Sequence, residues 1–412
     1  MTDDPFLPMS YFNLCNPLTM LYTCIAHVWL AAANRLSGLK HPIQTPDNKG
    51  VTTKKLAIVT GCNTGIGYET AKRLVREHGW DVILACRSKD KALNASYRIN
   101  DCKKIGDGDG SPVGTAIVLE PVLDLSDFES VRTFVDAVRN EYDSIDVLIN
   151  NAGRNTSGRS PGNPKLDLMF QSNYLGHFLL TELLLKNKLL LSESSGTKVI
   201  NLSSVMHHFS KGEALDGGAF ESITSPTYWK RRALFSEKKS PDNIYSASKL
   251  AAILHSFELN RRYGDSNLTA IAVNPGAVNS DIWRGFPHWV RQHIFDKIYL
   301  TTEQGSEPIV AAAIRNDFTA DRESIMANNG RGAIIYLQPY ANPFSVFGGR
   351  WFPNSSSSTK ASVPSTLQGP MMPCMEMLGP YVGHMPTIPR LPANPEAAAE
   401  TLWRVSEELS HS

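Results

Sequence analysis

A tyrosine and a lysine stand four residues apart in the segment Tyr245-Ser246-Ala247-Ser248-Lys249. On a helix, this spacing puts both side chains on one face, one turn apart. A tyrosine hydroxyl has a pKa of about 10 and exchanges protons poorly near neutral pH, but a neighbouring ammonium group favours the phenolate. The pair therefore predicts a general acid and base, although a Tyr and a Lys at this spacing also occur on ordinary exposed helices.

Two serines, Ser203 and Ser204, follow an apolar run at residues 198–202. If that run is a strand of a parallel sheet, the serines lie at its carboxyl edge, where ligands bind. The hydroxyl of Ser204 could then bond a substrate oxygen and stabilise charge that develops on it. A serine at a strand end is also a common turn residue. The prediction that Ser204 is catalytic therefore depends on the tyrosine–lysine pair that follows it.

A glycine-rich segment, residues 60–67, reads Thr-Gly-Cys-Asn-Thr-Gly-Ile-Gly and joins a buried apolar run to a helical pattern. Gly61, Gly65 and Gly67 let the backbone turn sharply and approach a pyrophosphate closely. The N-terminus of the following helix offers N–H groups and a positive dipole end to the phosphates. Glycine-rich turns also simply end strands, but this strand–turn–helix context is the one that a dinucleotide site requires.

The residue after the second predicted strand selects between the two nicotinamide cofactors. An acid there bonds the adenosine 2′-hydroxyl of NAD and repels the 2′-phosphate of NADP. The chain has Ala85-Cys86-Arg87 instead, and an arginine suits a phosphate through forked, charge-assisted hydrogen bonds. We therefore expect NADP (NADPH) rather than NAD; the alternative is that Arg87 is an ordinary solvated arginine.

Strands and helices alternate from residue 55 onward, as in a parallel sheet that is covered on both faces. Short apolar runs predict about seven strands, at residues 56–60, 81–85, 116–119, 146–149, 198–202, 268–273 and 333–337. Helical periodicity predicts helices at 68–77, 128–141, 166–191 and 245–262. The expected fold class is α/β, a Rossmann-type doubly wound sheet that forms one domain over residues 51–337.

The N-terminal segment, residues 1–50, is an apolar leader. Its most apolar part is residues 18–33, and a membrane-spanning helix needs about 20 such residues, so two interpretations stay open. As a membrane anchor, it would leave the catalytic domain in the cytosol, because Arg35, Lys40 and later lysines follow it; the endoplasmic reticulum or a lipid droplet would fit. As a leader helix packed on the domain, it would leave the protein cytoplasmic. The acidic Asp3 and Asp4 disfavour a secretory signal or transit peptide.

Two stretches interrupt the alternation of strands and helices. Residues 206–243 separate a strand end from the next helix, and residues 338–393 form a long Pro/Ser-rich insertion in which we expect little regular structure. Residues 394–412 then form a C-terminal helix that packs on the catalytic domain. Asn394 can cap this helix, and Pro395 suits its first position.

The net charge and the cysteine pattern indicate which partners, metal sites and cellular compartments to expect. The chain of 412 residues has a net charge of +1, which gives no electrostatic reason to expect nucleic acid as a partner. Its six cysteines form no C-x-x-C pair and show no metal-site spacing. We expect scattered reduced thiols, no metal site and a domain that faces the cytosol.

Taken together, these segments resemble the short-chain dehydrogenase/reductase family, of the classical type, over approximately residues 55–276. The resemblance rests on the order and spacing of several motifs. These are the glycine segment, Asp124 in Leu-Asp-Leu, Asn150-Asn151-Ala152-Gly153, Asn173, Ser204, Tyr245 with Lys249, and Asn274-Pro275-Gly276.

The resemblance implies a role for each catalytic residue. Tyr245 would be the general acid and base, and Lys249 would hold the nicotinamide ribose and lower the tyrosine pKa. Ser204, rather than Ser203, would orient the substrate oxygen, and Asn173 would anchor a water in a proton relay. Asp124 would touch the adenine, Asn151 would line the cofactor groove, and residues 275–278 would pass beside the nicotinamide. The expected cofactor contacts are Gly61, Asn63, Gly65, Ile66, Gly67, Arg87, Asp124, Asn151, Tyr245, Lys249, Pro275 and Val278.

Within the family, residues 173–178 (Asn-Tyr-Leu-Gly-His-Phe) and 85–87 resemble the retinol-dehydrogenase-like branch. This implies an oxidoreductase for a small lipophilic alcohol or carbonyl substrate (retinoid-, steroid- or fatty-aldehyde-like), with a homodimer possible. Three departures are the long gap between Ser204 and Tyr245, Ser280 in place of a usual threonine, and the insertion at 338–393. Because the gap adds material beside the substrate pocket, the substrate class stays open.

Two other functions are compatible with the same fold. One is a catalytically weak cofactor-binding regulatory or scaffold protein, and the other is an isomerase or epimerase, which no residue here selects. The presence of all four predicted catalytic residues weighs against a scaffold, since a pure binding module need not keep them.

Overall fold

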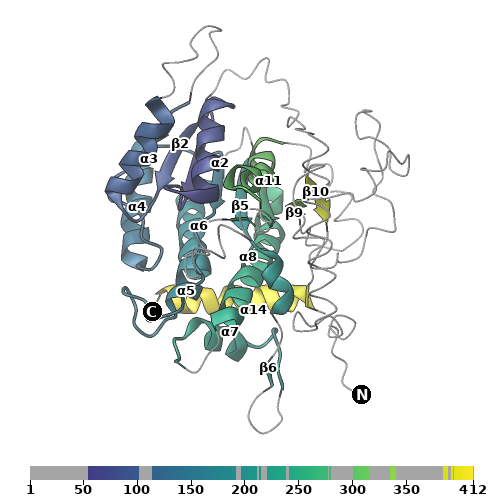
Figure 1. Cartoon of the computed structure of the whole chain (residues 1–412). Coiled ribbons are helices and arrows are strands. Elements are labelled where there is room, and N and C mark those ends of the chain that lie inside the picture. Colours follow the sequence, from purple (N-terminus) through teal and green to yellow (C-terminus); the bar gives the residue numbers. More distant parts are fainter. Residues whose placement is uncertain are drawn as a thin grey trace, which may run out of the picture.

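The computed structural model describes residues 54–101, 114–191, 196–210, 213–214, 220–237, 241–276, 278–279, 300–315, 335–339, 384–387, 391–392 and 394–411. Strands and helices alternate over these residues around one large sheet (Figure 1). The leader, residues 1–50, and most of the 338–393 insertion lie outside the described residues. Within the part of the chain that the structure describes, no helix is both long enough and apolar enough to span a bilayer.

The main sheet has eight strands among the described residues, in the order β10-β9-β8-β5-β4-β1-β2-β3. Seven neighbouring strands pair in parallel, which confirms the predicted doubly wound sheet. Strand order reverses between β1 and β4, and ligands bind at such a switch point. The strands are β1 (Leu56–Thr60), β2 (Asp81–Ala85), β3 (Ala116–Ile117), β4 (Val147–Asn150), β5 (Thr197–Leu202), β8 (Leu268–Val273), β9 (Ile335–Pro339) and β10 (His384–Thr387).

The edge of this sheet differs from the prediction. β10 pairs antiparallel with β9, so the insertion expected to have little regular structure supplies an eighth strand. β9 begins two residues after the expected start at 333, and β3 ends two residues before the expected end at 119. β10 and β3 are the two edge strands of this sheet, and each pairs with a single neighbour.

Helices cover both faces of the sheet, as predicted, because alternate residues of each buried strand point to opposite sides. In β1, Ala57 and Val59 belong to one apolar core, which is covered by α2 (Gly65–Arg76), α3 (Lys89–Asp101) and α11 (Thr302–Ile314). Leu56 and Ile58 belong to the other core, which is covered by α4 (Phe128–Glu141), α6 (Gly176–Lys186) and α8 (Pro241–Tyr263).

The single helix expected at residues 166–191 is wrong in detail. In the structure this segment contains α5 (Leu168–Phe170), a π-helical turn at Gln171–Leu175 and then α6. In this turn the backbone N–H of Gly176 donates to the carbonyl of Gln171, five residues back. Such π-turns are frequent at functional sites.

The 206–243 stretch also contains regular structure. A short 3-10 helix runs over Val205–Phe209, the strands β6 (Glu213–Ala214) and β7 (Phe220–Glu221) pair with each other, and α7 (Pro226–Ala233) follows. The side chain of Ser225 caps α7 by accepting a hydrogen bond from the backbone of Thr227.

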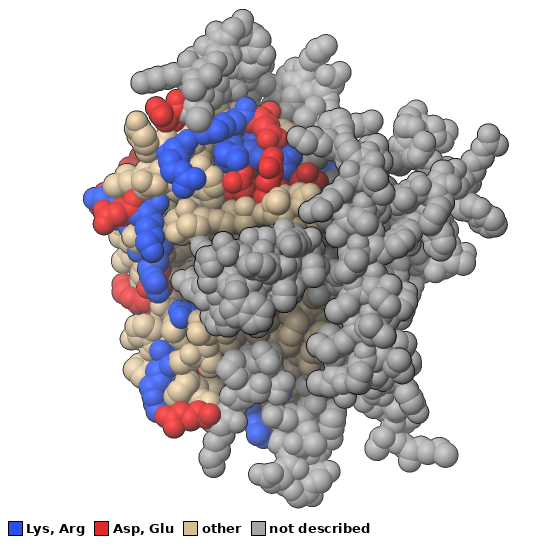
Figure 2. Space-filling view, viewed as in Figure 1, with Lys and Arg blue, Asp and Glu red and all other residues tan. Residues whose placement is uncertain are grey.

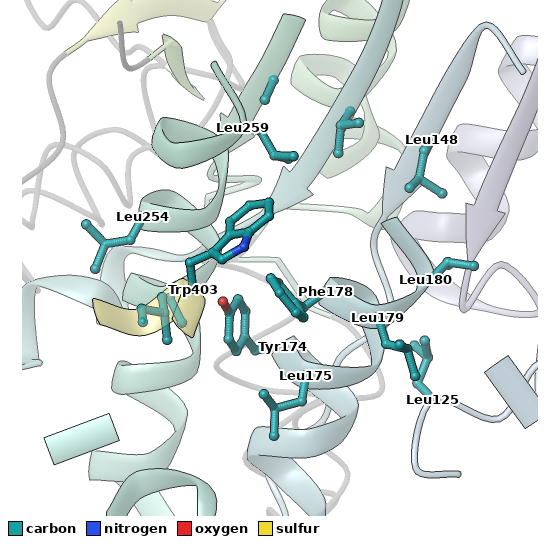
Figure 3. Packing of buried hydrophobic residues seen from close by; sticks show 14 of the residues in the cluster. Leu125, Leu148, Tyr174, Leu175, Phe178, Leu179, Leu180, Leu254, Leu259 and Trp403 are labelled. Carbon is teal, nitrogen blue, oxygen red and sulfur yellow. The ribbon is translucent and has the colours of Figure 1, made fainter. Parts of the chain in front are cut away.

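The C-terminal helix α14 (Pro395–His411) packs across α8, α6 and α7. Asn394 caps it through its side chain. The ring of Trp403 extends from α14 and lies beside that of Phe178 (Figure 3), with 5.1 Å between the two ring centroids. Ser406 Oγ donates to the Tyr174 hydroxyl at 3.0 Å. The helix therefore seals the apolar core between α6 and α8.

Charged side chains of both signs mix on the surface over α2 (Figure 2). On that helix Lys72 pairs with Glu69, and Arg73 pairs with Glu77 at 3.1 Å. Each of these cations is paired with a carboxylate one turn away on the same helix, so this face carries no uniform charge that would mark a binding surface.

Candidate active site

The predicted site residues gather where β1, β4 and β5 end. These three strands are neighbours in the sheet, with Val59 opposite Ile149 and Asn150 opposite Asn201. The chain leaves them through the glycine turn after Thr60, the loop after Asn150 and the serine pair after β5. All three segments therefore start from the same edge, at the switch point of the sheet.

The glycine turn needs its glycines for two different reasons. Gly61 and Gly65 have φ values of +64° and +65°, which disfavour other residues. A Cβ on Gly61 would lie 2.9 Å from Ala152, and one on Gly67 would lie 2.3 Å from Asn151 Nδ2. By contrast, a Cβ on Gly65 would meet nothing within 4 Å, so at this position the turn faces open space.

Asn151 holds this turn in place. Its Nδ2 donates to the carbonyl of Thr60 at 2.7 Å and to that of Gly61 at 3.3 Å. The backbone N–H groups of Asn151 and Ala152 both donate to Thr60 Oγ1 at 2.9 Å. The side chain predicted to line the cofactor groove therefore bonds the backbone of the turn itself.

The residues around this turn fit a dinucleotide pyrophosphate. The N-terminal turn of α2 contains no acidic residue, and Thr64 makes no side-chain cap there. Its N–H groups can therefore meet an anion without a competing carboxylate. Asn63 and Ile66 are half-buried in the same segment. Beneath this segment, the free thiols of Cys62 and Cys86 lie 3.5 Å apart. These two cysteines are therefore neighbours, and not scattered as the sequence suggested.

Arg87 follows β2 and Asp124 follows β3, and these two strands pair with each other in the sheet. Arg87 is exposed directly after β2, and it takes part in none of the ion pairs that the described residues form. Asp124 is half-buried, and its Oδ1 accepts hydrogen bonds from the backbone and hydroxyl of Ser126 at 2.9 and 2.6 Å. Its carboxylate is thus fixed in a turn after β3.

The segment after β8 brings Pro275 and Val278 to the same edge. Gly276, with a φ of +83°, turns the chain, and its N–H donates to Asn274 Oδ1 at 3.0 Å. A Cβ on Gly305 of α11 would lie 2.5 Å from Val278 Cγ2. α11 therefore fixes Val278 by close approach, a role that the sequence did not reveal.

Ser204, Tyr245 and Lys249 form one cluster. A side-chain hydrogen bond joins Ser204 and Tyr245, and Lys249 Nζ lies 5.6 Å from the centroid of the Tyr245 ring. Lys249 Nζ also donates to the carbonyl of Leu202 at 3.1 Å. Ser203, by contrast, donates from its hydroxyl to the carbonyl of Lys249 at 2.9 Å and ties β5 to α8.

Burial shifts the pKa values of the acid–base pair in opposite directions. Contrary to the expectation that Lys249 lowers it, the pKa of Tyr245 is raised by burial to about 12, against a smaller lowering by the hydrogen bond with Ser204. Burial lowers the pKa of Lys249 to about 8. At neutral pH the phenol is therefore protonated, and the lysine is charged in most molecules.

Asn173 lies in the π-turn and binds the loop after β4. Its Nδ2 donates to the carbonyl of Arg154 at 2.9 Å and to Ser248 Oγ at 3.2 Å, and its Oδ1 accepts from the backbone of Arg154 at 2.8 Å. A Cβ on Gly153 would lie 3.5 Å from Lys249 Nζ. Residues 151–154 thus touch the glycine turn on one side and the lysine on the other.

Two residues of this site were missed by reasoning from the sequence. Thr60 receives the two backbone hydrogen bonds described above. Buried His177 contacts both Thr60 Oγ1 and the carbonyl of Asn173. The segment Asn-Tyr-Leu-Gly-His-Phe at residues 173–178 contains His177, but nothing in the sequence pairs it with a residue 117 positions earlier.

The fold and this cluster define a nicotinamide-dependent oxidoreductase of the Rossmann type. A family model described as short chain dehydrogenase matches residues 55–213. Retinol dehydrogenase 11 from Homo sapiens is 34% identical over 262 residues, which are 63% of this chain and 73% of that protein. Retinol dehydrogenase 12 from Mus musculus is 34% identical over 264 residues, 64% of this chain and 74% of that protein.

The chain therefore belongs to the short-chain dehydrogenase/reductase family, in its retinol-dehydrogenase-like branch. Among solved structures, an uncharacterised protein from Mycobacterium paratuberculosis is similar to it with a TM-score of 0.51. That similarity covers 90% of this chain and 96% of the other at 23% identity, and it shows the common fold.

Proposed function

We propose that the protein is an NADP-dependent oxidoreductase that moves a hydride between the nicotinamide and a lipophilic alcohol or carbonyl compound. The observation that carries the proposal is the cluster of Ser204, Tyr245 and Lys249. It lies one loop away from the glycine turn, because Asn151 bonds that turn and Gly153, two residues later, lies beside Lys249 Nζ. Acid–base chemistry and dinucleotide binding are therefore supported at adjacent positions.

In the reducing direction, Tyr245 donates its hydroxyl proton to the carbonyl oxygen of the substrate. The raised pKa of this phenol keeps it protonated beforehand, as a general acid must be. Ser204 bonds the same oxygen, and the charged Lys249 stabilises the phenolate that remains. In the oxidising direction, the same phenolate removes the proton from an alcohol.

The bound nicotinamide would supply or accept the hydride. The glycine turn and the N-terminus of α2 would hold its pyrophosphate, with contacts from Asn63 and Ile66. Lys249 would hold the nicotinamide ribose, with Pro275 and Val278 beside the ring, and Asp124 would contact the adenine. Asn173 would anchor the water that links Lys249 to solvent. Arg87 would bond the 2′-phosphate, and this charge is the reason for preferring NADP over NAD.

The proposal for the substrate class is supported by the relatives, which are retinol dehydrogenases by name. We propose a retinoid-, steroid- or fatty-aldehyde-like compound. We further propose that residues 18–33 attach the protein to a membrane, where such apolar substrates partition, and leave the catalytic domain in the cytosol.

The test is NADPH consumption by the full-length chain, with retinaldehyde, a steroid ketone and a long-chain aldehyde as substrates. Tyr245→Phe keeps the ring and removes the ionisable hydroxyl, so turnover should fall on the order of 10²-fold or more, while NADPH binding stays. Tyr263→Phe, which changes another tyrosine of α8 away from the cluster, serves as the matched control. Full activity in Tyr245→Phe would refute the mechanism.

The same experiment separates the proposed enzyme from a scaffold. If the wild-type protein binds NADPH and turns over none of the three substrate classes, the cofactor-binding scaffold becomes the better description. If product analysis of the same reactions shows a substrate converted to an isomer with no net consumption of NADPH, the isomerase or epimerase alternative holds.

A further inference from the structure

His177 is buried in the first turn of α6, with 3% of its surface exposed. Its Nδ1 lies 3.1 Å from the main-chain carbonyl oxygen of Asn173, in the π-turn. Its Nε2 lies 2.9 Å from Thr60 Oγ1, at the end of β1 where the glycine turn begins. One imidazole thus touches a proposed catalytic segment and the proposed cofactor turn.

The partners fix the tautomer of this imidazole. A carbonyl oxygen can only accept, so Nδ1 must carry the proton and donate it to Asn173. Nε2 is then the acceptor, and the hydroxyl of Thr60 must donate to it. Burial lowers the pKa of His177 to about 4, with a smaller lowering from Lys249, so the ring is neutral at physiological pH.

The same logic fixes the hydroxyl of Thr60. Its oxygen accepts from the backbone N–H groups of Asn151 and Ala152, each at 2.9 Å. Its one proton goes to His177, since the other acceptor in reach, the carbonyl of Ile149, is more distant at 3.3 Å. Because the Thr60 oxygen accepts two hydrogen bonds and donates its one proton to His177, its hydroxyl group has a single orientation.

We infer that His177 is a positioning residue that joins the cofactor turn to the catalytic π-turn through its two ring nitrogens. The bond from Nδ1 holds the carbonyl of Asn173, so it acts on the proton-transfer step. The bond at Nε2 orients Thr60 and, through it, residues 151–152 beside the glycine turn, so it acts on cofactor affinity. This inference rests on the proposed function.

Two isosteric substitutions separate the two bonds. His177→Asn puts an amide close to the position of Nδ1, where it can still donate to Asn173 but cannot reach Thr60. His177→Gln puts its amide close to the position of Nε2 and loses the contact with Asn173. We expect the Asn variant to bind NADPH roughly three- to tenfold more weakly with kcat retained, and the Gln variant to lose kcat by a similar factor with NADPH affinity retained.

Thr60→Val removes the hydrogen bond between Thr60 and His177 by changing its other partner, and it keeps the side-chain volume. It should weaken NADPH binding more than His177→Asn does, because it also removes the acceptor of the backbone N–H groups of Asn151 and Ala152. Adding His177→Asn to it should cause no further loss, because the bond between Thr60 and His177 is then already absent. His255→Phe is the matched control: it replaces another buried histidine, whose ring packs against Tyr174 and Phe178 but whose nitrogens make no hydrogen bond to the proposed site residues. It should leave both kcat and the NADPH Kd unchanged.

The outcomes distinguish this inference from a structural role and from failure of the proposed function. If the Asn and Gln variants both lose kcat and affinity alike, or both keep them, His177 does not join the two segments in this way. Absence of turnover in the wild-type protein overturns the proposed function; the NADPH Kd values of the Thr60 and His177 variants still decide the inference, since additive losses reject it.

Discussion

His255 offers a quantitative test of how the core between α6, α8 and α14 is built. The imidazole is 1% exposed and lies between the rings of Tyr174, Phe178 and Trp403, with centroids 5.9, 5.5 and 5.8 Å away. Neither ring nitrogen has a hydrogen-bond partner among the described residues. Protonation inside this aromatic box is therefore unfavourable.

Burial, with a smaller effect of His177, lowers the pKa of His255 to about 3 from 6.5. Because the unfolded imidazole binds its proton first, the folded state loses stability as the pH falls below 6.5, down to the folded pKa. Between about pH 8 and pH 5, protonation of the imidazole in the unfolded state lowers the free energy of unfolding by about 2 kcal/mol. This interval extends about 1.5 pH units below the unfolded pKa, and each unit contributes about 1.36 kcal/mol. His177, with a pKa of about 4, adds a similar amount.

The measurement is the free energy of unfolding of His255→Phe and of the wild-type protein in urea, at about pH 8 and pH 5. We expect the variant to lose about 2 kcal/mol less than the wild type over this interval. At pH 8 the two should be similar, because removal of two unpaired nitrogens offsets the larger ring.

Tyr174→Phe is the matched control in the same aromatic box. It removes the hydroxyl that accepts from Ser406 and should lower stability by about 1 kcal/mol at both pH values. If the wild type and His255→Phe lose the same stability between the two pH values, His255 is not held neutral by burial and the reasoning is wrong.

Three further predictions concern the cofactor site and the leader. Arg87→Asp should shift the ratio of kcat/KM for NADPH over NADH by roughly tenfold or more toward NADH; an unchanged ratio would place recognition of the 2′-phosphate elsewhere. Gly67→Ala should weaken NADPH binding by about tenfold or more, measured by fluorescence titration, because the added Cβ would displace Asn151 from the turn. Removal of residues 1–50 should move the protein from the membrane pellet to the supernatant with activity on a water-soluble aldehyde retained; a full-length chain that is already in the supernatant without detergent would contradict the membrane anchor.

The parts of the fold that could be predicted are those in which local pattern and tertiary structure agree. β1, β2, β8 and α4 have the predicted bounds because apolar runs or helical periodicity end at clear turn residues. α3 was missed because its buried side consists of two alanines and one isoleucine, Ala92, Ala95 and Ile99, which give a weak periodic signal. α11 was missed although Thr301 and Gln304 form a capping box, since Pro308 argues against a helix.

The π-turn could not be predicted because a distant contact accompanies it. A Cβ on Gly176, directly after the turn, would lie 2.4 Å from the carbonyl oxygen of Leu125. Only glycine permits this approach of α6 to the segment after β3. A one-residue shift in the hydrogen-bond pattern of a helix leaves the apolar periodicity almost unchanged, so the sequence predicted one continuous helix.

The predicted catalytic residues were recognisable from spacing along the chain, but what holds them in place was not. Beneath the site, Asn150 Nδ2 donates to Asn201 Oδ1 at 2.8 Å and to Thr181 Oγ1 at 3.2 Å. Asn201 in turn donates to Ser256 Oγ at 2.9 Å, and Thr181 donates to the carbonyl of His177 at 2.8 Å. These bonds connect β4, β5, α6 and α8 within the core.

Apolar contacts alone would hold these elements together without fixing their register, because the hydrophobic effect has no direction. Hydrogen bonds between buried side chains do have direction, and a partner lost from such a network leaves another polar group unsatisfied. Sliding β5 against α8 would break the bond between Asn201 and Ser256, and would also move Ser204 away from Tyr245. The polar residues below the site therefore define the distances above it, which is why long-range side-chain pairs, invisible to local sequence patterns, decide the geometry of the proposed catalytic cluster.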